Sequence, residues 1–241
     1  MMNKFLGLVK WSLIRHKYIL PVFSILQAVL ALAMVYGLSL FMHDIDEISA
    51  VYLATGTIAI GMIAVGCVLC AQIVGEAKQN GIFNYQRSLP TSRFNIIIAD
   101  IFIWGLAALP GVIVSCIAAL LRFDIEMSIT FSGVIIVLLF LITMIVIGFS
   151  IAYLFKPNMV GMVTQLIMIV SLLFSPITFP ASRLPDWIVR VYNFFPFVPA
   201  TNLLRASLFD VGSFKFLNLL TVIAWCVACF ALSLSTLSKK D

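Results

Sequence analysis

Residue types that carry catalytic or metal chemistry are few and far apart in this sequence of 241 residues. The five cysteines include two Cys-x-x-Cys pairs, Cys67 with Cys70 and Cys226 with Cys229, a spacing that indicates metal or redox chemistry in a soluble protein. Here both pairs lie in apolar segments without a neighbouring His or carboxylate, where a thiolate is strongly disfavoured. We therefore interpret the cysteines as small packing residues and expect no metal or cofactor in this chain.

The sequence also lacks the motifs of an enzyme that acts alone. No segment has the Walker A form Gly-x-x-x-x-Gly-Lys-Ser/Thr, so the chain cannot bind and hydrolyse ATP in that way by itself. No pairing of a nucleophile with a general base is visible. The net charge of +5 is no sign of nucleic-acid binding, because in so apolar a chain the distribution of basic residues carries the information. We expect a protein that is not an enzyme and has no nucleic-acid partner.

Three polar side chains lie in apolar surroundings and form a possible intramembrane polar site. Asp100 is the carboxylate candidate, at the start of an apolar stretch, and Gln27 and Gln165 are neutral amides inside two others. Ion-coupled transporters usually hold such carboxylates as proton or ion sites. The alternative for Asp100 is a structural ion pair with Arg93 or Lys10. Hydrogen bonds between helices explain the glutamines at least as well as contact with a substrate.

The elements that must position these residues are six long segments without Asp, Glu, Lys or Arg. They run over residues 18–43, 48–75, 101–121, 127–155, 157–182 and 216–238. Each has about 21–29 residues, and about 20 residues cross the hydrocarbon core of a membrane as a helix. The composition agrees, with 63% hydrophobic residues, 10% charged residues and a mean hydropathy of +1.15. Because the apolar runs are continuous rather than alternating, a barrel is excluded, and we predict an all-α membrane protein with six transmembrane helices in a single domain, residues 1–241.

The distribution of basic residues predicts the orientation of these helices. Ten of the 15 Lys and Arg residues lie before the first segment, between the second and third, between the fourth and fifth, or after the sixth. The first intervening loop carries three acidic residues and no basic one. The positive-inside rule then predicts a multi-pass protein of the cell membrane, with both termini in the cytoplasm and external loops at 43–48, 122–126 and 181–215.

Two shorter segments are predicted to lie on the cytoplasmic side. Residues 1–17 combine apolar residues with four basic ones, a pattern typical of an amphipathic helix that binds the lipid surface. Residues 76–93 connect the second and third membrane helices. Within them, Asn80-Gly81 ends one helix, a short helix follows, and Pro90 ends it. The alternative for this connection is an ordinary solvated loop.

The longest external connector is rich in proline and aromatic residues. Five of the nine prolines lie between Pro176 and Pro199. Pro185 is well placed to begin a short helix through about Phe194, and a second helix is expected from Ala200 to about Phe209. We interpret residues 181–213 as short re-entrant helices that dip into the outer leaflet, where aromatic rings settle at the head-group level. The alternative is an external lid with no role beyond packing.

Two of these segments together resemble the permease subunits of the ABC (ATP-binding-cassette) type-2 exporter family. The first is similar to the family's ATPase-coupling segment through Glu76, Gly81, Phe83, Arg87, Leu89, Pro90 and Arg93. The second is similar to its external gate region through Pro180, Leu184, Pro185, Trp187, Pro196 and Arg205. The chain departs from the family pattern at Phe195, where an Asn is usual, and at Asp100, where a basic residue is common.

The resemblance implies a permease subunit that pairs with a second, identical or different permease and with separate ATPase subunits, which hold ATP and Mg²⁺. It implies export of an amphipathic or hydrophobic substrate, such as a peptide, a drug, a lipid or a lipid-linked glycan. The residues leave two other readings open: an ion-coupled secondary transporter or channel, and a membrane scaffold or sensor without transport. The scarcity of intramembrane charge speaks against the ion-coupled reading.

Overall fold

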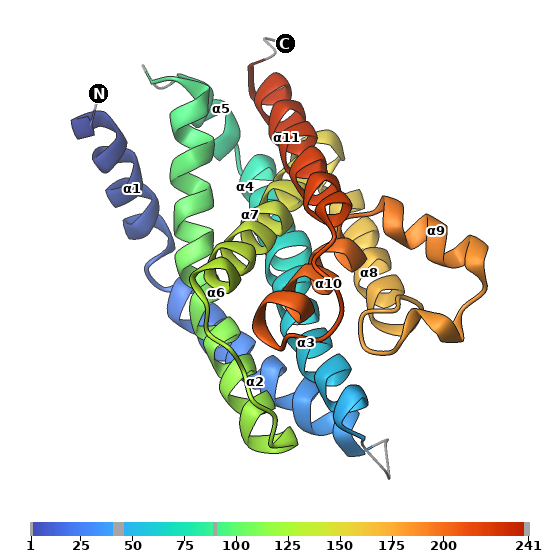
Figure 1. Ribbon diagram of the computed structural model, residues 1–241. Helices are drawn as coiled ribbons and strands as arrows, with labels where there is room; N and C mark the ends of the chain where they lie inside the picture. The colour runs from blue at the N-terminus through green and yellow to red at the C-terminus, as the bar shows by residue number, and fades with distance from the viewer. Residues whose placement is uncertain (1, 41–45, 89–90, 239–241) are drawn as a thin grey trace.

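The computed structural model describes residues 2–40, 46–88 and 91–238, with the side chains of residues 2–6, 38, 83 and 87 left out, and within these ranges the chain is helical (Figure 1). The helices of the first half are α1 (Met2–His16), α2 (Ile19–Leu40), α3 (Glu47–Ile63), the π-helix η1 (Ala64–Cys70), α4 (Ala71–Gln79), α5 (Ile82–Ser88) and α6 (Arg93–Phe123). Those of the second half are α7 (Phe131–Leu154), α8 (Pro157–Leu173), the 3₁₀ turn η2 (Ala181–Arg183), α9 (Asp186–Phe194), α10 (Phe197–Leu208) and α11 (Phe216–Ser238).

Five stretches of the described chain are long and apolar enough to cross a membrane, and they coincide with five of the six predicted segments. They are Ile19–Gly37, Glu47–Gln79, Arg93–Phe123, Phe131–Leu154 and Phe216–Ser238. The prediction of a sixth span over 157–182 is met only in part, because α8 has 17 residues and ends at Leu173. Pro176 disfavours helical backbone at the residue before it, so the helix ends before the apolar segment does. A 17-residue helix is about 26 Å long, at the lower limit for a span.

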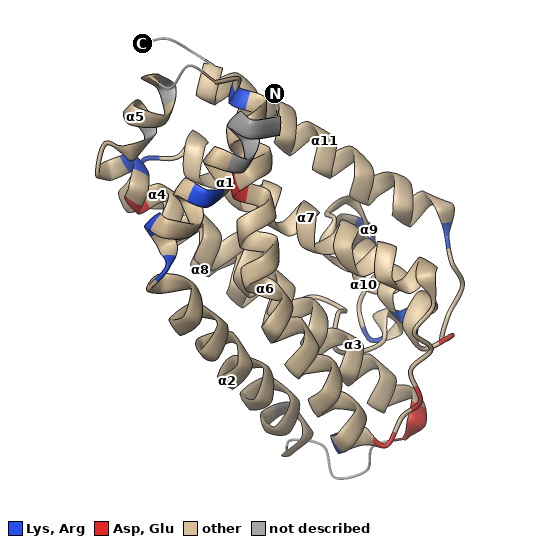
Figure 2. Ribbon diagram, turned by 90° about the vertical axis from the view of Figure 1, so that its left-hand side faces the viewer, with Lys and Arg blue, Asp and Glu red and all other residues tan. Residues whose placement is uncertain are grey.

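The two chain ends lie at the same end of the helix assembly. Figure 1 shows α1, α5 and the C-terminal half of α11 at that end, which we call the terminal end. The last turns of α2 and α6 and the first turn of α3 lie at the opposite end (Figure 1). Charged residues gather towards the two ends and leave a largely uncharged middle (Figure 2). This distribution is the one expected of helices that cross hydrocarbon.

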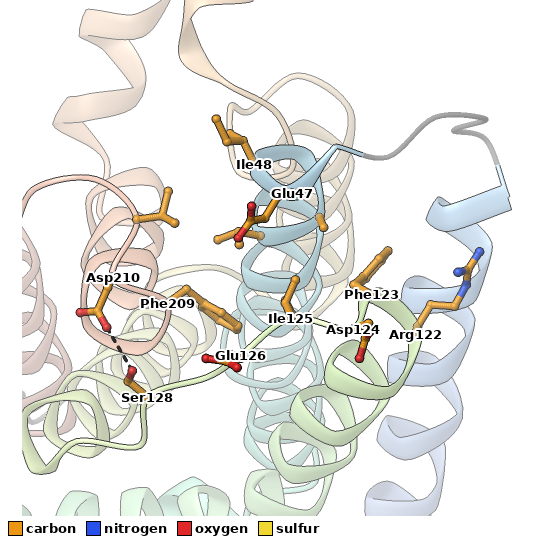
Figure 3. Close-up of a pocket in the computed structure, with 13 residues that line it drawn as sticks. Glu47, Ile48, Arg122, Phe123, Asp124, Ile125, Glu126, Ser128, Phe209 and Asp210 are labelled. Atoms are coloured by element: carbon orange, nitrogen blue, oxygen red, sulfur yellow. Dashed lines mark hydrogen bonds between the residues drawn. The ribbon is translucent and has the colours of Figure 1, made fainter.

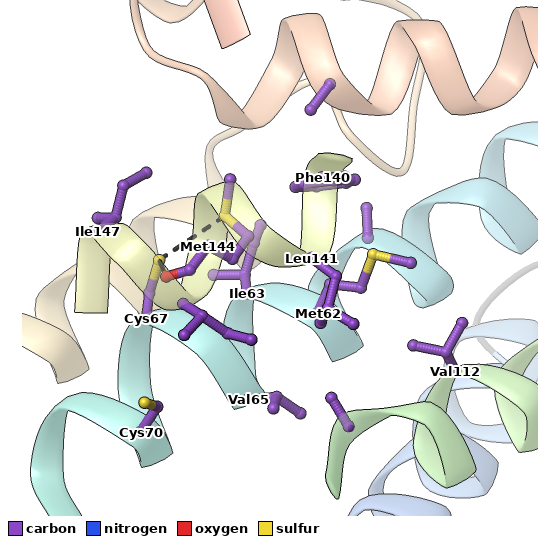
Figure 4. Close-up of a cluster of buried hydrophobic side chains, with 14 of the residues drawn as sticks. Met62, Ile63, Val65, Cys67, Cys70, Val112, Phe140, Leu141, Met144 and Ile147 are labelled. Carbon is purple, nitrogen blue, oxygen red and sulfur yellow. Dashed lines mark hydrogen bonds between the residues drawn. The ribbon is translucent and has the colours of Figure 1, made fainter. Parts of the chain in front are cut away.

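The centre of the fold is a close contact between η1 and α7. A side chain at Gly66 would meet the backbone of Met144 and Ile145 at 2.6–2.7 Å, and a side chain at Gly148 would meet the carbonyl oxygen of Gly66. The thiol of Cys67 lies 3.5 Å from the carbonyl oxygen of Met144 (Figure 4). Two helices therefore touch through their backbones, and the cysteine acts as a small packing residue, as the sequence indicated.

Small residues also bring α2 and α6 together. Gly111 lies against the side chain of Gln27, where a Cβ atom would have no room, and the hydroxyl of Ser24 donates to the carbonyl oxygen of Ala107 at 3.4 Å. The spacing Ala107-x-x-x-Gly111 puts both small residues on one face of α6. The middle of α6 thus packs against α2, the first membrane helix.

The predicted amphipathic helix forms as α1, and one face of it packs on protein. Leu8, Ser12 and His16, each one turn apart, are buried, whereas Lys10 is exposed. The ring of His16 lies 5.3 Å from that of Trp104 on α6. We expected this helix to lie on the lipid surface, and the structure adds that its inner face is a contact with α6.

Candidate functional site

The connection from α4 to α5 has the helix, turn and short helix that the sequence predicted for residues 76–88. Asn80 ends α4, and Gly81 follows with a φ of 77°, a left-handed conformation that favours glycine. The short helix α5 then projects at the terminal end (Figure 1), and the exposed Glu76 lies on the last turns of α4. Phe83 and Arg87 belong to α5, although their side chains are not described, and Leu89 and Pro90 lie outside the described residues. Ser92 caps α6 by accepting a hydrogen bond from the backbone N–H of Asn95.

Lys78 fastens this segment to the end of α7. Its Nζ donates to the carbonyl oxygens of Ala152, Tyr153 and Phe155 at 3.3, 2.8 and 3.1 Å. Two of these carbonyls belong to the last turn of α7 and the third to its C-cap residue Phe155, where no intrahelical donor remains and the helix dipole favours a cation. From the sequence, Lys78 was only one of the basic residues predicted to lie on the cytoplasmic side. A lysine just after a long apolar stretch was the sequence signal for this role.

Asp100 stands at the junction of three elements at the terminal end. Its Oδ1 accepts a hydrogen bond from Ser12 on α1 at 3.1 Å, and its Oδ2 accepts one from Gln86 on α5 at 3.3 Å. Arg93, one of the two partners proposed from the sequence, donates to the backbone oxygen of Gln86 at 3.0 Å. We call Ser12, Gln86, Arg93 and Asp100 the inner polar cluster. Through this cluster α5 contacts both α1 and the start of α6.

Aromatic and basic side chains of α1 surround this cluster. Trp11 contacts Tyr85 of α5, with 5.8 Å between ring centroids, and the guanidinium of Arg15 lies 4.5 Å from the Trp11 ring. Burial lowers the pKa of Arg15, and the carboxylate of Asp100 acts against that shift. Burial, followed by the charge of Arg15, lowers the pKa of His16 to about 4, so its imidazole is neutral at pH 7. The cluster is thus a packed junction rather than a solvated loop.

In the predicted external gate region, Arg205 is a buried cation that joins α10, α3 and the segment between α8 and η2. Its Nε donates to Thr55 on α3 at 3.2 Å, Nη1 to Asn202 at 2.9 Å, and Nη2 to the carbonyl oxygen of Ile177 at 2.9 Å. The guanidinium also lies 3.6 Å from the ring centroid of Tyr52. With 3% of its surface exposed, Arg205 is far more enclosed than an interfacial residue. The sequence analysis predicted that Arg205 lies in the external gate region. It gave no sign that Tyr52, Thr55 and Ile177 are its partners.

The remaining residues of the predicted gate region shape the chain around this cation. Pro185 immediately precedes α9, which ends at Phe194 as expected, and Pro196 precedes α10, which begins three residues before the predicted Ala200. Pro180 precedes η2, and Leu184 follows it. Trp187 is 66% exposed, and no residue of α9 is fully buried, so this helix lies on the outside of the bundle.

One comparison identifies the family of this protein. A family model described as ABC-2 type transporter matches residues 9–209, which is most of the chain. The chain belongs to the ABC-2 type transporter family. No curated protein matches it. The protein is therefore a multi-pass membrane component of an ABC transporter, as its apolar helices and the resemblance of its two segments predicted.

The three residues of the predicted intramembrane polar site do not meet in this ABC-2 protein. Asp100 joins the inner polar cluster at the terminal end. Gln27 is buried against Gly111, and its amide has no hydrogen-bond partner within the described part of the chain. Gln165 lies on the exposed face of α8, while the nearby Gln72 donates to Thr164 at 3.2 Å and so joins α4 to α8. The three residues thus lie in separate places and do not form one site.

A pocket of about 1000 Å³ opens at the end opposite the termini (Figure 3). Its wall carries the carboxylates of Glu47, Asp124, Glu126 and Asp210, and Arg122 is the one cation among its described lining residues. Asp210 accepts a hydrogen bond from Ser128, which ties the α6–α7 loop to the end of α10 (Figure 3). The permease therefore presents a negative field at this end, which attracts cations and repels anions.

Proposed function

We propose that this protein is the transmembrane subunit of an ATP-driven exporter that moves an amphipathic or hydrophobic substrate out of the cell. It works with a second permease and with ATPase subunits that hold ATP and Mg²⁺, since the chain has no Walker A motif. The terminal end faces the cytoplasm in this proposal. One observation supports this proposal most directly. Gln86 on α5 donates a hydrogen bond to Asp100 on α6, and Asp100 also accepts a hydrogen bond from Ser12 on α1.

The proposed mechanism follows from these links. When ATP closes the ATPase dimer, the partner pushes on α5 and the exposed surface around Glu76. Gln86 passes this displacement to α6 and α1, and Lys78 passes it to the end of α7. Because α6 carries α2 and because α7 touches η1 through backbone, the long helices move as packed bodies. Nucleotide shifts the state only because the ATPase binds the two arrangements of the permease with different affinity.

Co-purification tests the partnership, and two substitutions test the link. Tagged protein is expected to retain an ABC ATPase, and Glu76→Ala is expected to weaken that association because Glu76 lies on the exposed coupling surface. Gln86→Ala is expected to leave association intact but to lower substrate-stimulated ATP hydrolysis. The matched control is Asn84→Ala on the exposed face of the same helix. If no ATPase is retained, or if Gln86→Ala behaves like Asn84→Ala, the proposal is wrong in its partner or in its mechanism, respectively.

A further inference from the structure

A second cavity, of about 470 Å³, lies among α3, α9, α10 and α11 and has a positively charged wall. Arg205 and Lys215 contribute two cations, and no Asp or Glu is among its described lining residues. The nearest acidic residue in sequence, Asp210, lines the other pocket and accepts from Ser128. The two cavities of this region thus have opposite charge. One attracts cations, and the other attracts anions.

The wall of this cavity is rich in hydrogen-bond donors. Arg205 has five N–H groups and uses three of them on Thr55, Asn202 and Ile177, so its two terminal nitrogens each keep one N–H. Because Oδ1 of Asn202 accepts from Arg205, the amide nitrogen of Asn202 remains a donor. The amides of Asn193 and Asn218 and the ammonium of Lys215 line the same cavity. Charged and neutral donors gathered in one cavity wall fit an oxyanion.

The start of α11 adds to this preference. The backbone oxygen of Lys215 accepts from the N–H groups of Asn218 and Leu219 at 3.0 and 3.4 Å, so the helix begins at the cavity. α11 has 23 residues, and its first turn, with Leu217 and Asn218, is part of the lining. The positive end of the helix dipole therefore acts together with Arg205 and Lys215.

An apolar groove next to the cavity indicates what kind of molecule carries the anion. On α9, Val189 and Asn193 line the cationic cavity, whereas Trp187 and Val191 line a groove of about 400 Å³ on the other face of the helix. That groove is completed by Val170, Leu173 and Phe174 at the end of α8, together with Phe179, Leu184, Ile188 and Tyr192. A charged cavity and an apolar groove share one short helix. This arrangement suits a ligand with an anionic head and a hydrocarbon chain.

We propose that the cavity at Arg205 and Lys215 binds the phosphate head group of an anionic amphiphile, whose hydrocarbon chain lies along the groove formed by α8 and α9. The assignment goes beyond the proposed function, because occupancy requires neither the ATPase nor transport. It distinguishes this part of the molecule from the acidic pocket, which repels the same head group.

Binding is tested on the purified full chain in a neutral detergent by following the thermal unfolding midpoint. Phosphatidylglycerol is expected to raise the midpoint more than phosphatidylcholine does at equal concentration, since a ligand of the folded state stabilises it by mass action. Lys215→Gln removes a cation from the wall, and Asn193→Asp adds a carboxylate to it. Each is expected to raise the phosphatidylglycerol concentration needed for a given shift about tenfold, because a charge-assisted hydrogen bond is lost or opposed.

Arg190→Gln is the matched control, because Arg190 is an exposed cation of α9 that does not line the cavity. It is expected to respond to phosphatidylglycerol like the unaltered protein. An equal response to the two lipids would overturn the proposal, and so would unchanged titrations in both Lys215→Gln and Asn193→Asp. Inorganic phosphate is titrated alone as a third arm. If it reproduces the full shift, the cavity is a site for the free ion and the assignment to an amphiphile is wrong.

Discussion

Single polar side chains tie distant parts of this permease together, and Lys78 is the clearest example. One ammonium group contacts three carbonyl oxygens at the end of α7, about 75 residues away along the chain. A flexible lysine has three donors, which match three carbonyls that the helix itself leaves unpaired. The ammonium group of Lys78 therefore holds α4 against the end of α7.

Replacing Lys78 is expected to cost stability at this contact. In Lys78→Gln the three carbonyl oxygens lose a charged donor, and we expect a loss of about 1–3 kcal/mol in the free energy of unfolding. The measurement is the unfolding midpoint of the purified protein in detergent. Lys156→Gln is the control, because Lys156 is an exposed cation that follows the same helix. Equal midpoints for the two variants would show that the carbonyl contacts contribute nothing.

Arg205 leads to a second comparison at the residue scale. Arg205→Ala leaves Thr55, Asn202 and Ile177 without their donor in a buried setting, so we expect a loss of about 2–4 kcal/mol. Arg205→Lys keeps the charge but not the planar fork, and is expected to fall in between. Arg183→Ala, in an exposed turn, is expected to change the free energy of unfolding by less than about 0.5 kcal/mol. If Arg205→Ala leaves the free energy of unfolding unchanged, the guanidinium is hydrated and water replaces its hydrogen bonds.

At the scale of elements, the helix starts were better predicted than the helix contacts. Pro185 and Gly81 act through their own backbone, so the positions of α9 and of the α4–α5 turn were readable from the sequence. The early end of α8 follows from Pro176, but hydrophobicity alone concealed it. The π-helix η1 has no local signal of this kind. It places Gly66 against α7, a contact that depends on residues far along the chain.

The contact between η1 and α7 predicts an unusual difference between two glycines. Gly148→Ala forces a methyl group against the carbonyl oxygen of Gly66, so we expect a destabilisation of about 1–3 kcal/mol or more. Gly161→Ala, in the interior of α8, meets no atom within 4 Å and is expected to stabilise the protein by about 0.5–1 kcal/mol. Unfolding midpoints of both variants in the same detergent measure the difference. A harmless Gly148→Ala would contradict the backbone contact between η1 and α7.

The docking of α1 on α6 is expected to depend on pH through His16. Its pKa is lowered to about 4 in the folded protein against an ordinary value of about 6.5, chiefly because burial disfavours the charged ring. A lowered folded-state pKa contributes stability that is fully present above about pH 6.5 and is lost as the pH falls towards 4. The other charged groups near this ring are Arg15, which repels the imidazolium, and Asp100, which is bonded to Ser12 one turn away.

Hydrogen exchange of the α1 backbone at pH 7 and pH 5, corrected for the intrinsic rate at each pH, measures this effect. Exchange protection of α1 is expected to fall at pH 5, because protonation of His16 favours the undocked helix. His16→Gln keeps a polar side chain that does not titrate, and is expected to remove most of the difference. Protection that falls equally in both proteins would assign the pH dependence to another group.

On the scale of the whole molecule, the sequence predicted the class of fold and the family but not the two junctions. Apolar length identified the spans, and two local patterns identified the ABC-2 relationship, because both signals lie within short stretches of chain. The inner polar cluster joins residues up to 88 positions apart, and Arg205 reaches Thr55 across 150 positions. No sequence spacing encodes such pairs. They arise when helices that must bury their polar groups are packed side by side.

The orientation of the whole molecule is open to a direct test with an impermeant thiol reagent. The exposed residues Asp46 and Asn80 are replaced singly by Cys in a protein whose five native cysteines are changed to Ala. Because α3 begins at the end opposite α5 (Figure 1), we expect the two sites to lie on opposite sides of the membrane. The positive-inside rule then predicts that Asp46→Cys is labelled in intact cells and that Asn80→Cys is labelled only after permeabilisation.

Two outcomes of this labelling carry different meanings for the permease. The reverse pattern would keep the fold and invert the proposed orientation, so that α5 would have no access to a cytoplasmic ATPase. Labelling of both sites from the same side would contradict the arrangement of the helices itself. Lys156→Cys, between α7 and α8, serves as a second inner site, and Asp186→Cys, at the start of α9, as a second outer site. Agreement of all four sites requires α8 to cross the membrane despite its 17 residues, since it alone connects Lys156 to Asp186.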